Sequence, residues 1–273
     1  MKGIKIGLVL ASVFCMSFAA CKERTNEGEA DVRSLNDPTA YYDKGNFYAE
    51  KGEFEKAAKS YSKAIELNPA YAMAYANRGG VYIELGDTAR GIENLSKAIE
   101  LNPRESSFYF NLGNLYTRRG EHDKALPYYS KVIELNPKDA EALYSRGLTY
   151  RMKGAYDSAI EDYSAAIGAF PKYYQAYSGR GQAFARINEY EKAIEDYTSA
   201  LAIKPKYFEA YYNRGNAYAR AQEPGRAIAD YSSAIELDPK SAKAYHNRGL
   251  IYRALGEARK ADEDEKKFQS LYK

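Results

Sequence analysis

The chain has 273 residues, and its 40 lysine and arginine residues against 37 aspartate and glutamate residues give a formal net charge of +3. This near balance gives no general reason to expect a nucleic-acid partner or a polybasic membrane surface. Both cysteines, Cys15 and Cys21, lie close to the N-terminus, and only two histidines occur. We therefore expect no disulfide framework, no metal site and no other cofactor in the rest of the chain.

The N-terminal segment has the layout of an export signal. Residues 1–5 carry two lysines, and residues 6–20 form an uncharged, mostly apolar run. This run is shorter than the roughly 20 apolar residues of a transmembrane helix, but it fits the apolar region of a signal peptide. The sequence Phe18-Ala19-Ala20-Cys21 then resembles a bacterial lipobox. The alternative is an ordinary cleaved signal peptide followed by a chance cysteine.

The lipobox resemblance implies that residues 1–20 are removed and that Cys21 carries several acyl chains, palmitate among them. Two or more acyl chains attach a protein stably to a membrane. Lys22 stands where an aspartate would favour retention in the inner membrane, so we expect the outer membrane if the cell has two. Residues 22–37 are polar and charged and cannot bury enough surface to fold. Segment 21–37 is therefore interpreted as the lipidated cysteine and a flexible tether.

From Pro38 onward the sequence repeats at a constant interval. A glycine recurs at Gly45, Gly79, Gly113, Gly147, Gly181, Gly215 and Gly249, and a proline ends six units at Pro69, Pro103, Pro137, Pro171, Pro205 and Pro239. With an aromatic residue three positions after each glycine, this order resembles the tetratricopeptide repeat (TPR) family, whose unit is a helix–turn–helix of about 34 residues. The resemblance implies an all-α fold for 38–273, a right-handed α-solenoid of about seven units: 38–71, 72–105, 106–139, 140–173, 174–207, 208–241 and 242–273.

Three local features lead to structural predictions. A glycine inside a helix costs about 1 kcal/mol relative to alanine, so its recurrence predicts that the two helices of a unit, A and B, pack closely there. Asn68-Pro69 and its equivalents are expected to cap and start the next helix. Pro127 is expected to kink or shorten the second helix of the third unit unless it lies close to the start of that helix.

In four units an arginine directly precedes the repeated glycine and an aspartate follows that arginine sixteen residues later. The arginines are Arg146, Arg180, Arg214 and Arg248, and the aspartates are Asp162, Asp196, Asp230 and Asp264. We expect each arginine to bridge helix A to helix B of its own unit, and we favour this role over ligand binding.

Stacked helix pairs form a superhelix with a concave surface, and in the TPR family one face of each A helix lines it and binds extended peptides. On this face the side-chain amides can hold a peptide backbone, because they donate and accept hydrogen bonds. The candidate partner-binding residues are the asparagines Asn46, Asn77, Asn111, Asn114, Asn213, Asn216 and Asn247, the rings Tyr42, Phe110, Tyr144, Tyr212 and His246, and the arginines Arg118, Arg151, Arg186, Arg220 and Arg253.

The arginines lie towards the C-terminal end and predict a preference for an acidic partner segment. The alternative is that they are solvated helix ends. A second candidate surface is the aromatic cluster at two junctions, for which packing between units is the favoured interpretation. Its members are Phe170, Tyr173, Tyr174, Tyr207 and Phe208.

No nucleophile elbow, P-loop or paired-carboxylate motif occurs, so the chain is not expected to be an enzyme. The resemblance implies a membrane-anchored protein–protein interaction scaffold of the bacterial cell envelope, which binds a protein or an extended peptide in its groove. The alternative is a ligand-handling TPR lipoprotein that cooperates with a solute-binding or transport protein.

Overall fold

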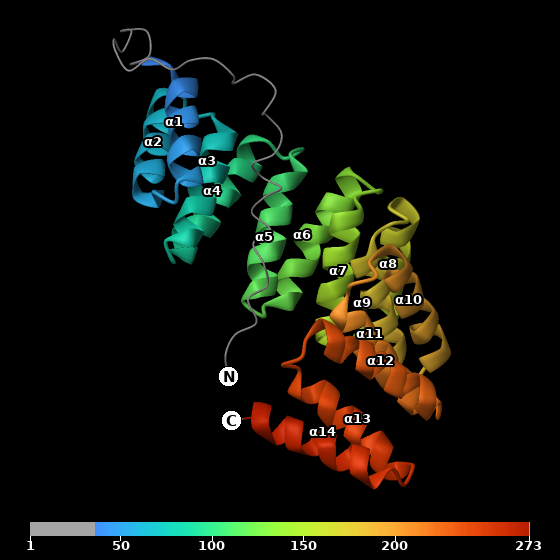
Figure 1. Cartoon of the computed structure of the whole chain (residues 1–273). Coiled ribbons are helices and arrows are strands. Elements are labelled where there is room, and N and C mark those ends of the chain that lie inside the picture. The colour runs from blue at the N-terminus through green and yellow to red at the C-terminus, as the bar shows by residue number, and fades with distance from the viewer. Residues whose placement is uncertain (1–35, 273) are drawn as a thin grey trace. The chain divides into compact units, whose positions relative to one another are not determined.

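The computed structural model describes residues 36–272, and within them the chain is entirely helical (Figure 1). The predicted signal peptide, the predicted lipidation site Cys21 and nearly all of the predicted tether lie outside the described residues. No helix between residues 36 and 272 is long and apolar enough to cross a membrane.

Fourteen helices, each of 13 or 14 residues, follow one another over the described part of the chain. The odd-numbered helices are α1 (Pro38–Glu50), α3 (Ala72–Glu84), α5 (Ser106–Arg118), α7 (Ala140–Lys153), α9 (Tyr174–Arg186), α11 (Phe208–Arg220) and α13 (Ala242–Ala254). The even-numbered helices are α2 (Phe54–Leu67), α4 (Thr88–Leu101), α6 (His122–Leu135), α8 (Tyr156–Ala169), α10 (Tyr190–Ile203), α12 (Pro224–Leu237) and α14 (Ala258–Leu271). The prediction of an all-α fold of seven helix pairs is confirmed.

The helices fall into two compact units, and the boundary lies inside α5, between Leu112 and Gly113. In the first unit α1, α2, α3 and α4 pack in sequence, and α1 also touches α3. In the second unit each helix from α6 to α14 packs on the next, and α7, α9, α11 and α13 also contact one another in order. The odd-numbered helices of the second unit therefore form one continuous layer.

In five of the seven helix pairs the repeated glycine makes room for a tyrosine ring from the second helix of the same pair. A Cβ atom at Gly45 would lie 2.5 Å from Cε1 of Tyr61, and one at Gly113 would lie 2.7 Å from Cε1 of Tyr129. These rings are the largest fully or almost fully buried side chains of the described residues: Tyr61, Tyr129, Tyr163, Tyr197 and Tyr231. The prediction of close packing between helices A and B is confirmed, and it is the tyrosine ring that requires it.

The asparagine–proline junctions end a helix and do not start one. Asn68 is the C-terminal cap of α2, and its Oδ1 accepts a hydrogen bond of 3.1 Å from the backbone N–H of Ala70 in the following turn. Helix α3 begins only at Ala72. The predicted N-cap role is wrong here, because residues 68–71 are used to reverse the chain. The prediction holds at Asp37, whose carboxylate accepts from the backbone N–H of Thr39.

Helix α6 runs through Pro127 and keeps the same length as the other even-numbered helices. Proline has a backbone φ that a helix accepts, although it lacks an N–H donor and its ring crowds the carbonyl four residues earlier. The prediction of a shortened helix is therefore wrong.

Candidate functional site: a cationic groove in the second unit

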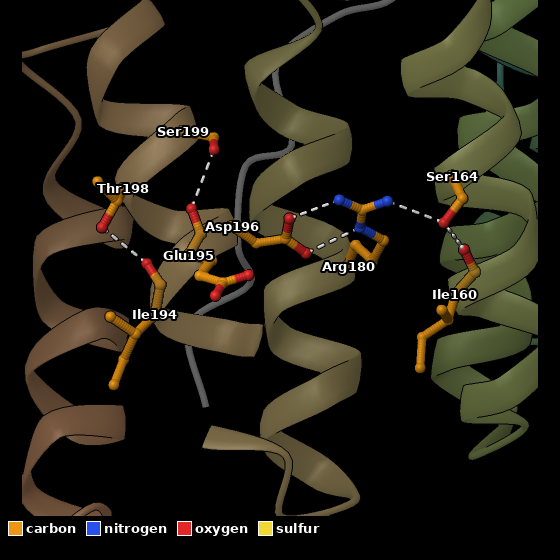
Figure 2. A network of polar contacts seen from close by, with 8 residues as sticks. All are labelled: Ile160, Ser164, Arg180, Ile194, Glu195, Asp196, Thr198 and Ser199. Atoms are coloured by element: carbon orange, nitrogen blue, oxygen red, sulfur yellow. Dashed lines mark hydrogen bonds and ion pairs between the residues drawn. The ribbon is translucent and has the colours of Figure 1, made fainter. Parts of the chain in front are cut away.

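Arginines directly before the repeated glycine are held by ion pairs inside the helix pairs. Nε of Arg180 lies 2.9 Å from Oδ2 of Asp196 and its Nη2 lies 2.7 Å from Oδ1, while Nη1 donates to Oγ of Ser164 at 2.9 Å (Figure 2). The predicted bridge within the helix pair is confirmed. The contact with Ser164, which belongs to the preceding pair, was not predicted.

The same arrangement recurs at Arg146, Arg214 and Arg248, which reach back to Ser130, Thr198 and Ser232. In the first unit Arg78 makes the corresponding contacts with an uncharged acceptor. Asn94 stands in the place of the aspartate, and Ser62 is the hydroxyl acceptor. Donating hydrogen bonds to the Asp196 carboxylate raises the pKa of the Arg180 guanidinium, and burial raises the pKa of the Asp196 carboxyl. These arginines are occupied by the fold and are not available to a partner.

A different set of arginines lines a groove of about 760 Å³ in the second unit. Its walls come from α7, α9, α11 and α13, the layer of odd-numbered helices, and tyrosines from α10 and α12 contribute to the lining. The lining residues are Arg151, Gln182, Ala185, Arg186, Asn188, Tyr190, Tyr197, Asn213, Asn216, Ala217, Ala219, Arg220, Tyr231, Asn247, Leu250 and Ile251. None of them is acidic, so every formal charge on the lining is positive.

The groove arginines Arg151, Arg186 and Arg220 lie at or near the C-terminal ends of α7, α9 and α11. A cation is favoured at that end of a helix by the helix dipole. Within residues 36–272 none of the three forms an ion pair, although Nε of Arg151 lies 3.4 Å from the hydroxyl of Tyr163. The next arginine of the row, Arg253, pairs with Asp262 at 3.3 Å and does not line the groove.

Asparagines on this layer form hydrogen bonds with one another and with the buried tyrosines. Oδ1 of Asn216 accepts from the hydroxyl of Tyr231 at 2.8 Å and from Nδ2 of Asn247 at 2.9 Å. Nδ2 of Asn247 also donates to the hydroxyl of Tyr212 at 3.1 Å. In the first unit Asn46, Asn77, Tyr61 and Tyr42 repeat this network. Part of the hydrogen-bonding capacity of these amides is therefore used within the protein.

Six of the predicted partner-binding residues meet in the groove: Arg151, Arg186, Asn213, Asn216, Arg220 and Asn247. Several others pack within the fold. The ring of Tyr144 lies 5.1 Å from that of Tyr173, and burial raises the pKa of Tyr144 to about 12. The ring of His246 lies 4.7 Å from that of Phe268. The remaining predicted residues do not line this groove: Tyr42, Asn46, Asn77, Phe110, Asn111, Asn114, Arg118, Tyr212 and Arg253.

Sequence reasoning missed the groove residues Gln182, Tyr197, Leu250 and Ile251. The recurrence of a tyrosine sixteen residues after the glycine was a signal for Tyr197, but this tyrosine lies on helix B, and only the A helices were expected to line the groove. In the second candidate surface, Tyr174 and Tyr207 lie in edge-to-face contact with ring centroids 5.1 Å apart. This contact supports the packing interpretation of the aromatic cluster.

Comparisons with known proteins agree with this architecture. Family models described as "TPR repeat" match residues 45–86 and 181–222, and others described as "Tetratricopeptide repeat" match 77–140, 112–173, 208–241 and 231–263. No curated protein sequence matches the chain.

Among solved structures, a tetratricopeptide repeat protein from Parabacteroides merdae is 25% identical with a TM-score of 0.66, over 88% of this chain and 93% of that one. MamA is 30% identical with a TM-score of 0.57, over 59% of this chain and 94% of that one. YrrB, described as a TPR protein with an unusual peptide-binding site, is 27% identical with a TM-score of 0.57, over 67% of this chain and 96% of that one.

Proposed function

The chain belongs to the tetratricopeptide repeat family, and from this premise we propose that it is a membrane-anchored protein–protein interaction scaffold of the bacterial cell envelope. Its partner is a protein that presents an acidic segment to the groove of the second unit. The observation that carries the proposal is a groove lined by three arginines and no carboxylate.

Charge supports this choice of partner. Arg151, Arg186 and Arg220 come from three successive odd-numbered helices, so their potentials add along the groove and attract an acidic chain. Their like charges repel one another until a partner neutralises them. The similarity to YrrB supports a peptide as the ligand class, because that protein is described as having a peptide-binding site.

Helix α13 contributes apolar side chains to the groove. Leu250 is 52% exposed, and Ile251 lines the groove beside it. An exposed apolar residue next to a polar wall is typical of an interface that buries a partner side chain. The proposed partner segment therefore carries an apolar residue besides its acidic ones.

The anchor is proposed from the sequence alone. Acylated Cys21 holds the chain at the membrane, with the outer membrane proposed for a cell that has two, and the segment 22–37 separates the anchor from the helices. Radiolabelled palmitate tests this part: we expect incorporation into the natural chain and none into a Cys21→Ser variant. Equal labelling of both chains would show that Cys21 is not the lipidated residue.

Crosslinking in cells, followed by purification of the full chain, tests the scaffold. The variant Arg186→Glu/Arg220→Glu reverses two groove charges and is expected to lose its captured partner. The matched control Arg226→Glu/Arg259→Glu makes the same charge change at two exposed arginines outside the groove and is expected to keep it. Capture of the same protein at the same yield by both variants would contradict the groove as the binding site. Capture of a solute-binding or transport protein would support the ligand-handling alternative instead.

A further inference from the structure

In five helix pairs a tyrosine ring packs against the repeated glycine. The hydroxyl groups of these five tyrosines differ in their hydrogen-bond partners. The hydroxyls of Tyr61, Tyr129 and Tyr231 donate to an asparagine one residue after the glycine, at 2.7, 2.7 and 2.8 Å. The hydroxyl of Tyr163 accepts from Nε of Arg151 at 3.4 Å. The hydroxyl of Tyr197 has no hydrogen-bond partner among the described residues.

The missing partner has a simple cause. In the fifth pair Gln182 stands where the first, third and sixth pairs have asparagine, and its Nε2 lies 3.5 Å from Oγ of Ser178. The longer side chain of Gln182 therefore makes no hydrogen bond with the hydroxyl of Tyr197. The Tyr197 side chain is only 1% exposed, and the small exposed part includes its hydroxyl oxygen, which is therefore open to the groove.

This unpaired hydroxyl belongs to the groove lining, together with Arg151. Arg151 is close enough to Tyr197 to favour its ionised form, but burial is the larger effect and raises the pKa of Tyr197. The hydroxyl therefore stays protonated at neutral pH and can donate a hydrogen bond. The guanidinium of Arg151 directs only Nε to Tyr163, so its Nη groups have no acceptor among the described residues.

We propose that the Tyr197 hydroxyl and the Arg151 guanidinium form a subsite for one carboxylate of the partner. This inference rests on the proposed function of the groove and names the group that the groove recognises. A carboxylate has two acceptor oxygens, one for the hydroxyl and one for the guanidinium, and hydrogen bonds to an ionised acceptor are the strong ones. The carboxylate belongs to an aspartate or glutamate side chain or to the C-terminus of the partner.

A first experiment tests whether the hydroxyl is unpaired in the free protein. Tyr197→Phe removes only this hydroxyl and is expected to leave the thermal unfolding temperature unchanged or to raise it. The matched control Tyr61→Phe removes a hydroxyl that is bonded to Asn46 and is expected to lower that temperature. A clear destabilisation by Tyr197→Phe would show that the hydroxyl already has a partner, and it would overturn the proposal.

A second experiment measures binding by calorimetry with the full chain in detergent and three synthetic peptides of equal length. One alternates Glu and Leu and has both ends blocked. The second has Gln in place of Glu and a free C-terminal carboxylate. The third has Gln and two blocked ends. We expect the first or the second peptide to bind, which identifies the source of the carboxylate. Tyr197→Phe and Arg151→Gln are each expected to weaken that binding about tenfold, the loss of one hydrogen bond to a charged group.

The outcomes separate the subsite from the groove. If Tyr197→Phe binds as well as the natural chain while Arg186→Glu/Arg220→Glu does not bind, the subsite is wrong and the groove function stands. If neither variant changes the binding, both are wrong. Binding of neither carboxylate peptide, or equal binding of the third peptide, would overturn the subsite. Inorganic phosphate that displaces the peptide and itself requires Tyr197 would reassign the subsite to phosphate.

Discussion

Nδ2 of Asn247 lies 2.9 Å from Oδ1 of Asn216, an amide-to-amide hydrogen bond that joins the sixth helix pair to the seventh. The same bond joins Asn77 to Asn46 in the first unit, also at 2.9 Å. In each case the accepting oxygen also receives the hydroxyl of the buried tyrosine, Tyr231 or Tyr61. A residue type expected to hold a partner thus also holds one helix pair to the next.

Substitution of this asparagine is predicted to reduce stability. Asn216→Ala leaves the hydroxyl of Tyr231 without its acceptor and leaves the amide of Asn247 with Tyr212 alone, and an unpaired buried group costs about 1–3 kcal/mol. We expect the free energy of unfolding in urea to fall by roughly that amount. Asn213→Ala is the control, because Asn213 lines the same groove and has no hydrogen bond from the described residues. Equal losses for both variants would refute the structural role of Asn216.

Removal of Arg180 is predicted to destabilise the second unit by about 3 kcal/mol, because it leaves the 5% exposed side chain of Asp196 as an unpaired buried charge. Arg180→Ala and its control Arg226→Ala are compared by chemical denaturation. Arg226 pairs with Glu223 on the surface, where such pairs are worth less than about 1 kcal/mol. A loss for Arg180→Ala no larger than that of the control would mean that the bidentate pair adds no stability.

Two glycines of the first unit are predicted to respond in opposite ways to alanine. A Cβ at Gly45 would lie 2.5 Å from the ring of Tyr61, and such overpacking costs about 1–3 kcal/mol. A Cβ at Gly80, also within a helix, meets nothing within 4 Å, so Gly80→Ala is expected to gain up to about 1 kcal/mol from helix propensity. Thermal unfolding of the two variants measures the difference. An increase in stability for Gly45→Ala would contradict the close packing.

Stability is predicted to decrease in alkaline solution. Burial raises the pKa of Tyr129 to about 12, above the value of about 10 for an exposed tyrosine. The folded state therefore holds its phenolic proton more tightly than the unfolded state. This contribution to stability is complete below pH of about 10 and is lost as the pH rises towards about 12. Urea unfolding across this range, with tyrosinate absorbance as a second signal, checks the trend, and Tyr129→Phe should weaken it. A constant free energy of unfolding over the range would contradict it.

The architecture could be predicted from the sequence because it depends on spacing. The constant interval between the repeated glycines located all seven helix pairs, and the fixed separation of Arg180 from Asp196 located the ion pair. The turn at Asn68 was misjudged because an asparagine before a proline suits both a helix start and a turn, and only the path of the chain decides between them.

Only part of the groove was predicted. The sequence shows which residues are charged, but it does not show which polar groups find a hydrogen-bond partner in the fold. Arg151, Arg186 and Arg220 were identified by their place on the A helices. Tyr197 looks like the other buried tyrosines, and only the contacts of Gln182 show that its hydroxyl is unpaired. Tyr144 and His246 were expected in the groove, but their rings pack against neighbouring rings.

In the second unit each arginine that directly precedes the repeated glycine donates a hydrogen bond to a hydroxyl of the preceding helix pair. The pairs therefore depend on one another in the order of the sequence. Arg180 depends on Ser164 of the earlier pair for its third hydrogen bond, whereas Ser164 already bonds to the carbonyl of Ile160 in its own helix. Each arginine cluster therefore needs only its own helix pair and the pair before it. Translation delivers the pairs in this same order. The arginine clusters of a growing chain can thus form one after another, whereas the tyrosine core of a pair is completed by the first helix of the next pair, as Ala176 and Ala183 of α9 complete the packing around Tyr163.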